Sequence, residues 1–591
     1  MRALLLVTLL ATGVSACGAS PASPPAAPPA APPSSAATVS APPASAPAGE
    51  PSLASKIDPL FAKLDADQAP GCSVGVYHAG EIVFEKGYGY ANLEWGGKNT
   101  PTTPIYLASM SKQFTAASTL LLVGDGKLAR TDDVRKYIPE LPDYGKVITV
   151  ENLLHHTGGV RDYGLLLGLS GREEDDLATT KDVLSLLSRQ KRLNFAPGTE
   201  FSYTNSGYVL LGEIVARVSG MTLAEFEKER IFAPLAMTST FVKDDYTRVV
   251  PGRAAGYAMG KDKTVHFAMG HSQIVGQGNI LSTIRDLAKW DANFYEPKIG
   301  GQALIDAMRV RGVLTDGTKL GYAGGLEEDV DPSNGLPREQ HNGGVNGYRT
   351  TMVRYPTART TVAILCNTGD VDPDELAADV SKVLLPGAPD KTANPPTDAA
   401  VKAPAPSSPI DPAIAGLYVD RDAAMVRFLA IEGGTLRVRR SAEGTGGLAL
   451  TATTPNVFVA EGGTSYTFSP GKRDKGKEPA RVVRKTSDGP ATTLVRVESV
   501  APLSAAALEE YAGRYGSEEV FRDSEVVARG GALVMRSWGS PDEDTHLKPV
   551  ARDYFLADGA GFSFERDKRG KVTGVVISDE RTRGVRLTRR P

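Results

Sequence analysis

Two proline-rich segments divide this chain and limit where a hydrophobic core can form. Residues 18–51 consist mostly of Pro, Ala and Ser, and residues 386–409 form a second stretch of this kind. Such segments contain too few apolar side chains to offset the entropy lost when a backbone becomes ordered. We therefore expect the folded parts of the 591-residue chain at residues 52–385 and 410–591.

The first 17 residues, MRALLLVTLLATGVSAC, have the pattern of an export signal. One Arg precedes an apolar run shorter than the roughly 20 residues that span a bilayer, and small residues follow. The ending VSAC resembles the lipobox of bacterial lipoproteins, which implies lipidation of Cys17; an ordinary secretory signal is the alternative. We expect an exported chain, lipid-anchored in the cell envelope at the outer membrane or the periplasmic face of a membrane, with residues 18–51 as a linker roughly 100 Å long.

The C-terminal region contains an internal repeat with an offset of 97 residues. AGLY at 415–418 matches AGRY at 512–515, IEGGTLRVR at 431–439 matches ARGGALVMR at 528–536, and Phe458 matches Phe555. Each unit alternates short strand-like stretches with Gly-rich turns. We predict two small β-barrels or sandwiches, at residues 410–500 and 501–591.

Residues 52–385 mix strand-like and helix-like patterns. The stretch CSVGVYHAGEIVFEKGYGYAN near the start indicates two strands joined by a turn, and TTVAILCN near the end indicates another strand. Between them, stretches such as YVLLGEIVARVSG have helical spacing. Strands at both ends with helices between them predict one α/β domain with a mainly antiparallel sheet.

The stretch YLASMSKQFTAAS places two serines before one lysine. Ser109 and Lys112 are three residues apart and share a face of a helix, whereas Ser111 points elsewhere. A serine hydroxyl becomes a good nucleophile when a base removes its proton. A lysine amine can serve as that base if burial or nearby positive charge lowers its pKa. Because the spacing alone is common, the chemistry needs further residues.

Two downstream stretches supply them. In SYTNSG, Tyr203 and Asn205 can point into one cleft, where a tyrosine transfers protons and an asparagine orients the lysine and a substrate amide. In HNGGVNGYRT, His341 opens a strand, and Gly343 allows a substrate backbone to approach the strand edge. The N–H of Gly344 would pair with that of the first serine as an oxyanion hole.

Together these motifs resemble the serine β-lactamase-like hydrolases of the class C type, which include β-lactamases, D-alanyl-D-alanine carboxypeptidases, D-aminopeptidases and esterases. ITVENLLHHTGGVRDY and GQGNILSTIRDLAKW extend the resemblance over residues 52–385. It implies a β-lactamase/penicillin-binding-protein-like domain whose antiparallel sheet is flanked by helices. It also implies an acyl-enzyme mechanism without metal or cofactor, in which Ser109 attacks a carbonyl while Lys112 and Tyr203 move protons.

His341 departs from the class C β-lactamases, which have lysine at this position. An imidazole is only partly charged near neutral pH, with an unperturbed pKa of about 6.5, so we expect it to hold a substrate carboxylate less firmly. The two repeats after the hydrolase-like domain resemble the domain plan of D-aminopeptidases. We therefore predict a peptidase, amidase or esterase acting on peptides or esters that contain D-amino acids. The alternatives are a β-lactamase and a non-catalytic, penicillin-recognising cell-wall binding or sensor protein.

The remaining expectations concern partners and single residues. The substrates are small peptides, amides, esters or β-lactams, and the net charge of −3 gives no indication of nucleic-acid binding. If the family's sheet holds, Cys72 and Cys366 lie on adjacent antiparallel strands; two buried free thiols are the favoured expectation and a disulfide is the alternative. His155 and His156 are expected to order a loop near the site rather than bind a metal. The basic tail at residues 581–591 is expected to flank a last strand.

Overall fold

The computed structural model describes residues 52–65, 68–172, 176–385, 410–421, 425–439, 447–460, 464–471, 479–485, 491–498, 503–536 and 544–591. The predicted signal peptide with Cys17, the linker 18–51 and the linker 386–409 lie outside the described residues. None of the helices in this described part combines the length and the apolar character that crossing a bilayer requires.

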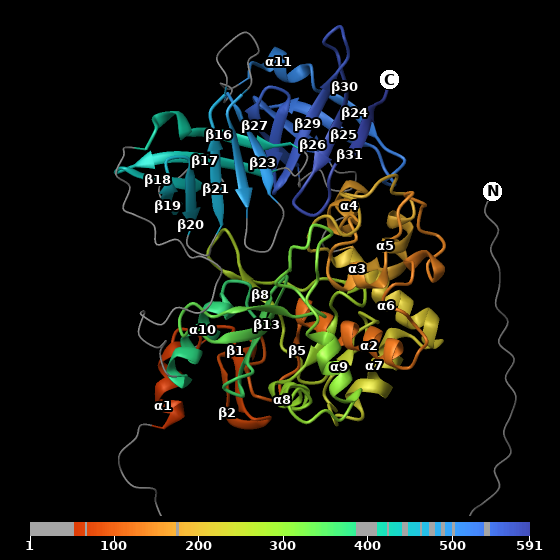
Figure 1. The fold of residues 1–591 in the computed structure, drawn as a ribbon, viewed down its shortest axis with the longest axis vertical. Helices are drawn as coiled ribbons and strands as arrows, with labels where there is room; N and C mark the ends of the chain where they lie inside the picture. Colours follow the sequence, from red (N-terminus) through yellow and green to blue (C-terminus); the bar gives the residue numbers. More distant parts are fainter. Residues whose placement is uncertain are drawn as a thin grey trace, which may run out of the picture. The chain divides into compact units, whose positions relative to one another are not determined.

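A six-stranded antiparallel sheet forms the centre of the N-terminal domain (Figure 1). Its order is β12-β13-β14-β15-β1-β2, so strands from the two ends of the domain sequence lie side by side. The strands are β1 (Cys72–His78), β2 (Glu81–Tyr88), β12 (Glu327–Val330), β13 (Pro337–Val345), β14 (Tyr348–Tyr355) and β15 (Thr360–Cys366). The predicted antiparallel sheet is confirmed.

Helices occupy much of the chain between β2 and β12. They are α2 (Lys112–Gly124), α3 (Val150–Leu154), α4 (Tyr163–Leu169), α5 (Thr180–Leu187), α6 (Asn205–Ser219), α7 (Leu223–Glu227), α8 (Ile284–Ala292) and α9 (Gly301–Met308), with α1 (Leu53–Ile57) and α10 (Pro373–Leu384) at the two ends of the domain. Short strands lie among them: β3 (Tyr90–Asn92), β4 (Gly97–Lys98), β5 (Ile105–Tyr106), β6 (Ala178–Thr179), β7 (Phe241–Val242), β8 (Tyr257–Met259), β9 (Val265–Phe267), β10 (Ser272–Gln273) and β11 (Ile280–Ser282). Nearly every residue of α2 is buried, so this helix forms the centre of the helical part.

Side chains on β15 alternate between two buried faces of the sheet. Val362 and Ile364 pack in one cluster with residues of α1 and α10, whereas Ala363 and Leu365 belong to the larger core that includes α8. Successive residues of a strand point to opposite faces, so a strand covered on both faces reads as a continuous apolar run. The sheet is therefore flanked by helices on both sides, as predicted.

Cys72 and Cys366 pair directly in the antiparallel register of β1 and β15, and a disulfide joins them. Both are fully buried. The favoured expectation of two free thiols is therefore wrong. The physical reason is the register, which sets the first residue of β1 opposite the last residue of β15.

Two closed eight-stranded β-barrels follow the N-terminal domain. The first consists of β16 (Gly416–Asp420), β17 (Met425–Glu432), β18 (Thr435–Arg439), β19 (Leu448–Thr454), β20 (Val457–Ala460), β21 (Ser465–Ser469), β22 (Arg481–Lys485) and β23 (Thr492–Val497). The second follows α11 (Ala505–Glu509) and consists of β24 (Gly513–Gly516), β25 (Ser524–Arg529), β26 (Ala532–Arg536), β27 (Thr545–Ala551), β28 (Tyr554–Ala557), β29 (Ala560–Arg566), β30 (Val572–Ser578) and β31 (Val585–Arg589). Of the two predicted architectures, barrel and sandwich, the barrel is confirmed.

The repeat in the sequence recurs in local geometry. Gly433 and Gly434 join β17 to β18 with φ of 56° and 78°, and Gly530 and Gly531 join β25 to β26 with φ of 59° and 79°. A tight two-residue hairpin turn with positive φ at both central positions is accessible to glycine without steric cost. The matching glycine pairs therefore build the same turn in both barrels.

Candidate active site

Ser109 and Lys112 come together at the start of α2. Ser109 belongs to the 3₁₀ turn Ala108–Ser111, and Lys112 is the first residue of α2. Residues three apart in a 3₁₀ turn eclipse each other, and Lys112 Nζ lies 3.1 Å from Ser109 Oγ. Ser111 lies elsewhere, because its hydroxyl oxygen accepts a hydrogen bond from the N–H of Ile280. The geometry therefore selects Ser109 as the serine beside the amine.

The Lys112 amine is fully buried and has three hydrogen-bond acceptors. Besides the serine hydroxyl, it donates to Asn205 Oδ1 at 2.8 Å and to the carbonyl oxygen of Gln277 at 2.9 Å. Burial lowers the pKa of Lys112 well below its ordinary value; the Asp162 carboxylate opposes this shift and the Arg581 guanidinium adds to it. An amine with a lowered pKa is available as a base closer to neutral pH.

A buried carboxylate holds the loop that carries Tyr203 and Asn205. Thr204, between them, is the N-cap of α6. Asp162 Oδ2 accepts hydrogen bonds from the N–H of Asn205 at 2.5 Å and from the Thr204 hydroxyl at 3.2 Å. Negative charge at a helix N-terminus is favourable because it pairs with N–H groups that lack partners inside the helix. Asp162 therefore fixes the position of Asn205, whose side-chain amide oxygen accepts a hydrogen bond from Lys112.

Two cationic groups lie close to the Tyr203 ring. Lys112 Nζ is 4.9 Å and the Arg581 guanidinium carbon is 5.0 Å from the ring centroid. Burial raises the pKa of Tyr203, while the Ser109 hydroxyl and Arg581 act in the opposite direction. Burial is the largest of these effects, so the phenol keeps its proton at neutral pH.

His155 and His156 pack behind the site. His156 Nδ1 accepts a hydrogen bond from the N–H of Thr204, and its ring lies 4.4 Å from the Tyr203 ring, centroid to centroid. His155 Nε2 contacts the Val310 carbonyl oxygen at 3.0 Å. Both histidines are buried. These contacts give them the role in ordering a loop that the sequence predicts.

His341 lies on β13 with both ring nitrogens engaged. Nδ1 lies 2.6 Å from the Asn342 carbonyl oxygen, which can only accept, so Nδ1 carries the proton of the neutral ring. Nε2 then accepts from the Tyr322 hydroxyl at 3.1 Å. Burial, together with the Lys112 charge, lowers the pKa of His341 to about 3. The expectation of a partly charged imidazole near neutral pH is therefore wrong, because the ring is removed from water.

Gly343 allows β13 to pack against the turn that carries the serine. A Cβ at this position would lie 2.2 Å from the Leu107 carbonyl oxygen and 2.5 Å from Thr350 Oγ1. Thr350 itself donates to the same carbonyl at 2.8 Å. The next residue in the turn, Ala108, has a φ of 48°, an uncommon conformation for a residue with a side chain. The close contact between β13 and Leu107 and the strained backbone of Ala108 therefore both lie next to Ser109.

A cavity of about 870 Å³ opens at this cluster. Its lining includes the predicted residues Ser109, Tyr203, Asn205, His341 and Gly344. Arg581, which comes from the loop at residues 579–584 between β30 and β31 of the second barrel, also lines it. Lys112 is not among the lining residues, but its amine contacts the Ser109 hydroxyl. The oxyanion-hole role of Gly344 stays a prediction.

Three residues at the site were missed by the sequence analysis. Gln277 lies in the stretch GQGNILSTIRDLAKW and contributes its backbone carbonyl oxygen, which no side-chain pattern marks. Asp162 lies within the stretch ITVENLLHHTGGVRDY, which supports the family resemblance but does not single out this carboxylate. Arg581 belongs to the basic tail that was expected only to flank a strand, so this expectation is incomplete.

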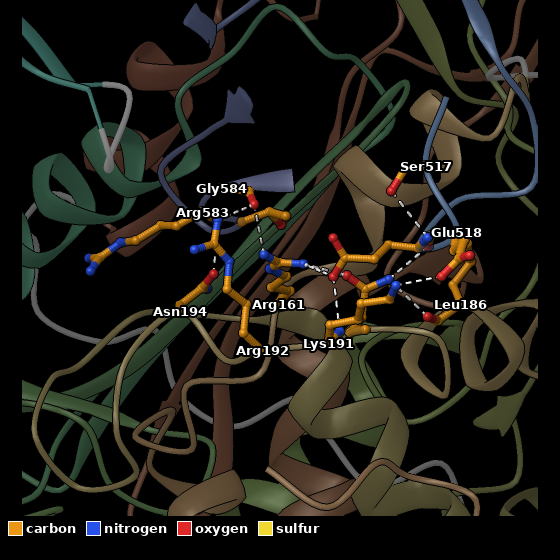
Figure 2. Close-up of polar contacts among 12 residues, drawn as sticks. Arg161, Leu186, Lys191, Arg192, Asn194, Ser517, Glu518, Arg583 and Gly584 are labelled. Atoms are coloured by element: carbon orange, nitrogen blue, oxygen red, sulfur yellow. Dashed lines mark hydrogen bonds and ion pairs between the residues drawn. The ribbon is translucent and has the colours of Figure 1, made fainter. Parts of the chain in front are cut away.

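Polar contacts attach the second barrel to the N-terminal domain (Figure 2). Arg161 donates to Glu519 Oε1 at 2.7 Å and to the Gly584 carbonyl oxygen at 3.0 Å. The N–H of Lys191 donates to the same carboxylate at 2.9 Å. Arg161 is almost fully buried, so this ion pair is shielded from water. Separating such a pair would leave a buried charge without its counter-ion, which opposes movement of the barrel away from the domain.

Several known proteins are similar to this chain in sequence and fold. A family profile described as Beta-lactamase matches residues 57–385. The D-aminopeptidase of Brucella ovis is 25% identical over 548 residues, which cover 88% of this chain and 96% of that protein. Penicillin-binding protein 4* of Bacillus subtilis is 29% identical over 381 residues, covering 61% of this chain and 81% of that protein.

Among solved structures, the octameric penicillin-binding protein homologue from Pyrococcus abyssi has a similar fold. It matches with a TM-score of 0.51 and 23% identity, over 75% of this chain and 99% of that chain. The family profile covers more than half of the 591 residues and spans the whole cluster from Ser109 to Gly344. The chain therefore belongs to the Beta-lactamase family and is a serine hydrolase of the β-lactamase/penicillin-binding-protein type.

Proposed function

We propose that this protein hydrolyses peptides, amides or esters that contain D-amino acids, through an acyl-enzyme on Ser109. The observation that carries the proposal is the buried Lys112 amine, 3.1 Å from Ser109 Oγ and 2.8 Å from Asn205 Oδ1. The match to a D-aminopeptidase over 88% of the chain supports the substrate class.

In the proposed acylation step, Lys112 in its neutral form accepts the Ser109 proton while Oγ bonds to the substrate carbonyl carbon. The N–H groups of Ser109 and Gly344 stabilise the oxyanion. The bond to the leaving amine or alcohol then breaks, and the leaving group takes a proton that Tyr203 or Lys112 supplies. In deacylation, neutral Lys112 accepts a proton from water as the water oxygen bonds to the acyl carbon; the bond from that carbon to Ser109 Oγ then breaks, and Oγ takes the proton back from Lys112, which releases the carboxylic acid and restores the serine hydroxyl and the neutral amine.

The absence of charge on His341, in the stretch HNGGVNGYRT, favours a peptidase, amidase or esterase over a β-lactamase. Class C β-lactamases carry lysine where this chain has His341. The His341 ring is neutral and both of its nitrogens have partners, so it does not offer the charge that lysine would offer there. A substrate that depends on a cation at this position is therefore disfavoured.

A covalent-labelling experiment tests the proposed nucleophile. A fluorophosphonate or a fluorescent penicillin is expected to label the wild-type protein, and intact mass is expected to show one adduct. Ser109→Ala is expected to abolish labelling. Ser111→Ala is the matched control, because its hydroxyl is buried two residues away and bonds to Ile280. Labelling that survives in Ser109→Ala, or a wild-type protein that forms no adduct, would contradict the proposal.

A substrate panel tests the proposed specificity. We expect turnover of a D-amino-acid amide, a D-alanyl-D-alanine peptide or a p-nitrophenyl ester to exceed turnover of a chromogenic cephalosporin. Faster cephalosporin turnover would establish the β-lactamase alternative. Acylation without release of product would establish the non-catalytic, penicillin-recognising alternative.

We also propose that Cys17 is lipidated and anchors the protein in the cell envelope. The support is the resemblance of VSAC to a lipobox at the end of the predicted export signal. Cys17→Ala is expected to move the protein from the membrane fraction to the soluble fraction. Membrane association that does not change in this variant would contradict the anchor.

A further inference from the structure

The loop at residues 579–584, here called the Arg581 loop, crosses from the second barrel to the catalytic domain. The Arg581 carbonyl oxygen accepts hydrogen bonds from the N–H of Asp162 at 3.2 Å and from Asn194 Nδ2 at 2.8 Å. The Thr582 hydroxyl donates to the Asp162 carbonyl oxygen at 2.9 Å. The backbone of the loop is therefore bonded to Asp162, the residue that also holds the loop of Tyr203 and Asn205.

The end of the same loop is tied to three catalytic-domain side chains, two of them shown in Figure 2. The Gly584 carbonyl oxygen accepts hydrogen bonds from Arg161 at 3.0 Å and from Arg192 at 2.5 Å. Arg583 forms an ion pair with Glu200 at 3.0 Å. Because residues 581–584 are all bonded to the catalytic domain, this part of the loop is a fixed part of the cavity wall.

The Arg581 side chain points its charge at the cavity without a carboxylate partner. Its guanidinium lies over the Tyr203 ring, and the residue lines the cavity that contains Ser109. The Asp579 carboxylate accepts a hydrogen bond from the Arg581 backbone N–H at 2.8 Å, but among the described residues no carboxylate forms an ion pair with the Arg581 guanidinium, whereas Arg583 is paired with Glu200. A guanidinium that faces a cavity, lies over an aromatic ring and forms no ion pair can bind an anion.

The other positive groups at the cavity are occupied. Arg172 is paired with Asp182 at 2.6 Å, and Lys112 donates to three acceptors, one of them the nucleophile. Burial lowers the pKa of His341 to about 3, so its ring is neutral near pH 7. Among the described residues of the lining, Arg581 is thus the cation left for a ligand.

Arg581 also lines a second cavity of about 1010 Å³, next to the first. Residues of both barrels line this second cavity, including Val426 of the first and Leu556 of the second. The guanidinium therefore stands where the two cavities meet. An anionic group bound there can belong to a substrate that extends from Ser109 toward the barrels.

We propose that Arg581 is a specificity-determining residue that binds a carboxylate of the substrate and so selects acidic substrates. The inference rests on the proposed function and narrows it to D-amino-acid peptides, amides or esters that carry a carboxylate. The second barrel thereby supplies a cation at a different place in the site from His341, which is neutral. A planar guanidinium can bind a carboxylate through two parallel hydrogen bonds.

Matched substrate pairs test this proposal. One pair, D-alanyl-D-alanine and D-alanyl-D-alaninamide, differs in charge on the leaving side. The other pair, the p-nitroanilides of N-succinyl-D-alanine and of its succinamide analogue, differs on the acyl side. The ratio of kcat/KM within each pair measures charge selectivity. In wild type we expect the carboxylate member to be favoured in at least one pair, and that pair identifies the side on which the charge is bound.

Variants of the Arg581 loop separate recognition from structure. Arg581→Ala is expected to lower that ratio about tenfold, the size expected for a lost hydrogen bond to a charged group. Arg581→Lys should restore part of it, and Arg581→Glu should invert it. Arg583→Gln, which weakens the attachment of the same loop but does not line the cavity, should leave the ratio as in wild type.

The outcomes distinguish this inference from the function on which it rests. If wild type is acylated at Ser109 and turns over both members, but Arg581→Ala leaves both ratios unchanged, the inference is overturned and the proposed function stands. A ratio that falls equally in Arg583→Gln also overturns it, because loop position would then explain the effect. Absence of any Ser109 adduct in wild type overturns the proposed function, and the inference with it.

Discussion

The Arg161 guanidinium donates a hydrogen bond to the Glu519 carboxylate at 2.7 Å across 358 sequence positions. This pair joins the catalytic domain to the second barrel, and both side chains are buried. Glu519→Gln would leave the Arg161 cation without its counter-ion in a site shielded from water. We expect the free energy of unfolding to fall by about 3–5 kcal/mol, and hydrogen exchange in the Arg581 loop to increase. Chemical denaturation and hydrogen–deuterium exchange mass spectrometry measure the two effects.

The neighbouring residue provides the matched control for this prediction. Glu518 pairs with Lys191, but the two side chains are 80% and 64% exposed. Exposed pairs contribute little because water and salt screen them. Glu518→Gln should therefore leave both stability and exchange close to wild type. Similar losses in the two variants would show that burial of the Arg161 pair is not what matters.

The pH dependence of catalysis should report on Lys112. Its neutral amine is the active form and burial lowers its pKa, so kcat/KM should rise with pH along an acid limb whose midpoint lies below the ordinary lysine value of about 10.4. Arg581 lowers the pKa of Lys112 further and Asp162 raises it. Arg581→Ala removes a repelling cation, so the acid limb should move to higher pH. His341, neutral near pH 7, should add no inflection there.

The pH–rate profile of an uncharged substrate tests this shift, because substrate binding by Arg581 then plays no part. Arg583→Gln serves as the control, since its charge is paired with Glu200. An acid limb that stays in place or moves to lower pH in Arg581→Ala would contradict the electrostatic link between the guanidinium and the amine.

Gly343→Ala should move β13 away from the turn that carries the nucleophile. The added methyl group would lie 2.2 Å from the Leu107 carbonyl oxygen, which is backbone and cannot rotate away. Overpacking of this kind costs about 1–3 kcal/mol, and the rate of Ser109 acylation should fall with it. Thermal denaturation and the rate of fluorophosphonate labelling check the two parts.

The next glycine controls for stability in this experiment. A Cβ at Gly344 would meet nothing closer than 3.6 Å, where it would contact the flexible end of Arg349. The melting temperature of Gly344→Ala should therefore stay near that of wild type. A loss of stability as large as that of Gly343→Ala would refute the steric argument.

Removal of the disulfide should destabilise the central sheet. It joins Cys72 and Cys366, which are 294 positions apart, so it restricts a large part of the unfolded chain. The double variant Cys72→Ala, Cys366→Ala should lose about 2–5 kcal/mol of unfolding free energy. A reductant should destabilise wild type by a similar amount and leave the variant unchanged. A wild-type protein with free thiols at both positions would disprove the pairing.

Local patterns allowed the largest part of the fold and site to be predicted. Ser109 and Lys112 lie within one turn, so their spacing alone places them together. The barrels were predicted because the repeat preserves its turn glycines, such as Gly433 and Gly530, at one offset. The site roles of Tyr203, Asn205 and the β13 residues were predicted from the family resemblance. No local pattern shows that these distant segments come together.

What could not be predicted depends on contacts between distant segments. No local pattern shows that Asp162 and the Arg581 loop are in contact, because this contact depends on how the second barrel packs against the catalytic domain. The neutral state of His341 likewise follows from burial and from Tyr322, neither of which is visible in the motif. The disulfide depended on register, since a shift of one residue between β1 and β15 would have separated the two sulfur atoms.

The position of Arg581 in the chain has a consequence for biosynthesis. It follows Ser109 by 472 positions, and the barrel that holds it closes only when β31 pairs with β24. A nascent polypeptide therefore possesses its nucleophile hundreds of codons before it possesses the wall that would discriminate among substrates. A stop codon just ahead of β31 would leave this barrel open and the Arg581 loop without its anchoring strand, so the charge selectivity proposed for Arg581 requires that translation reach this strand.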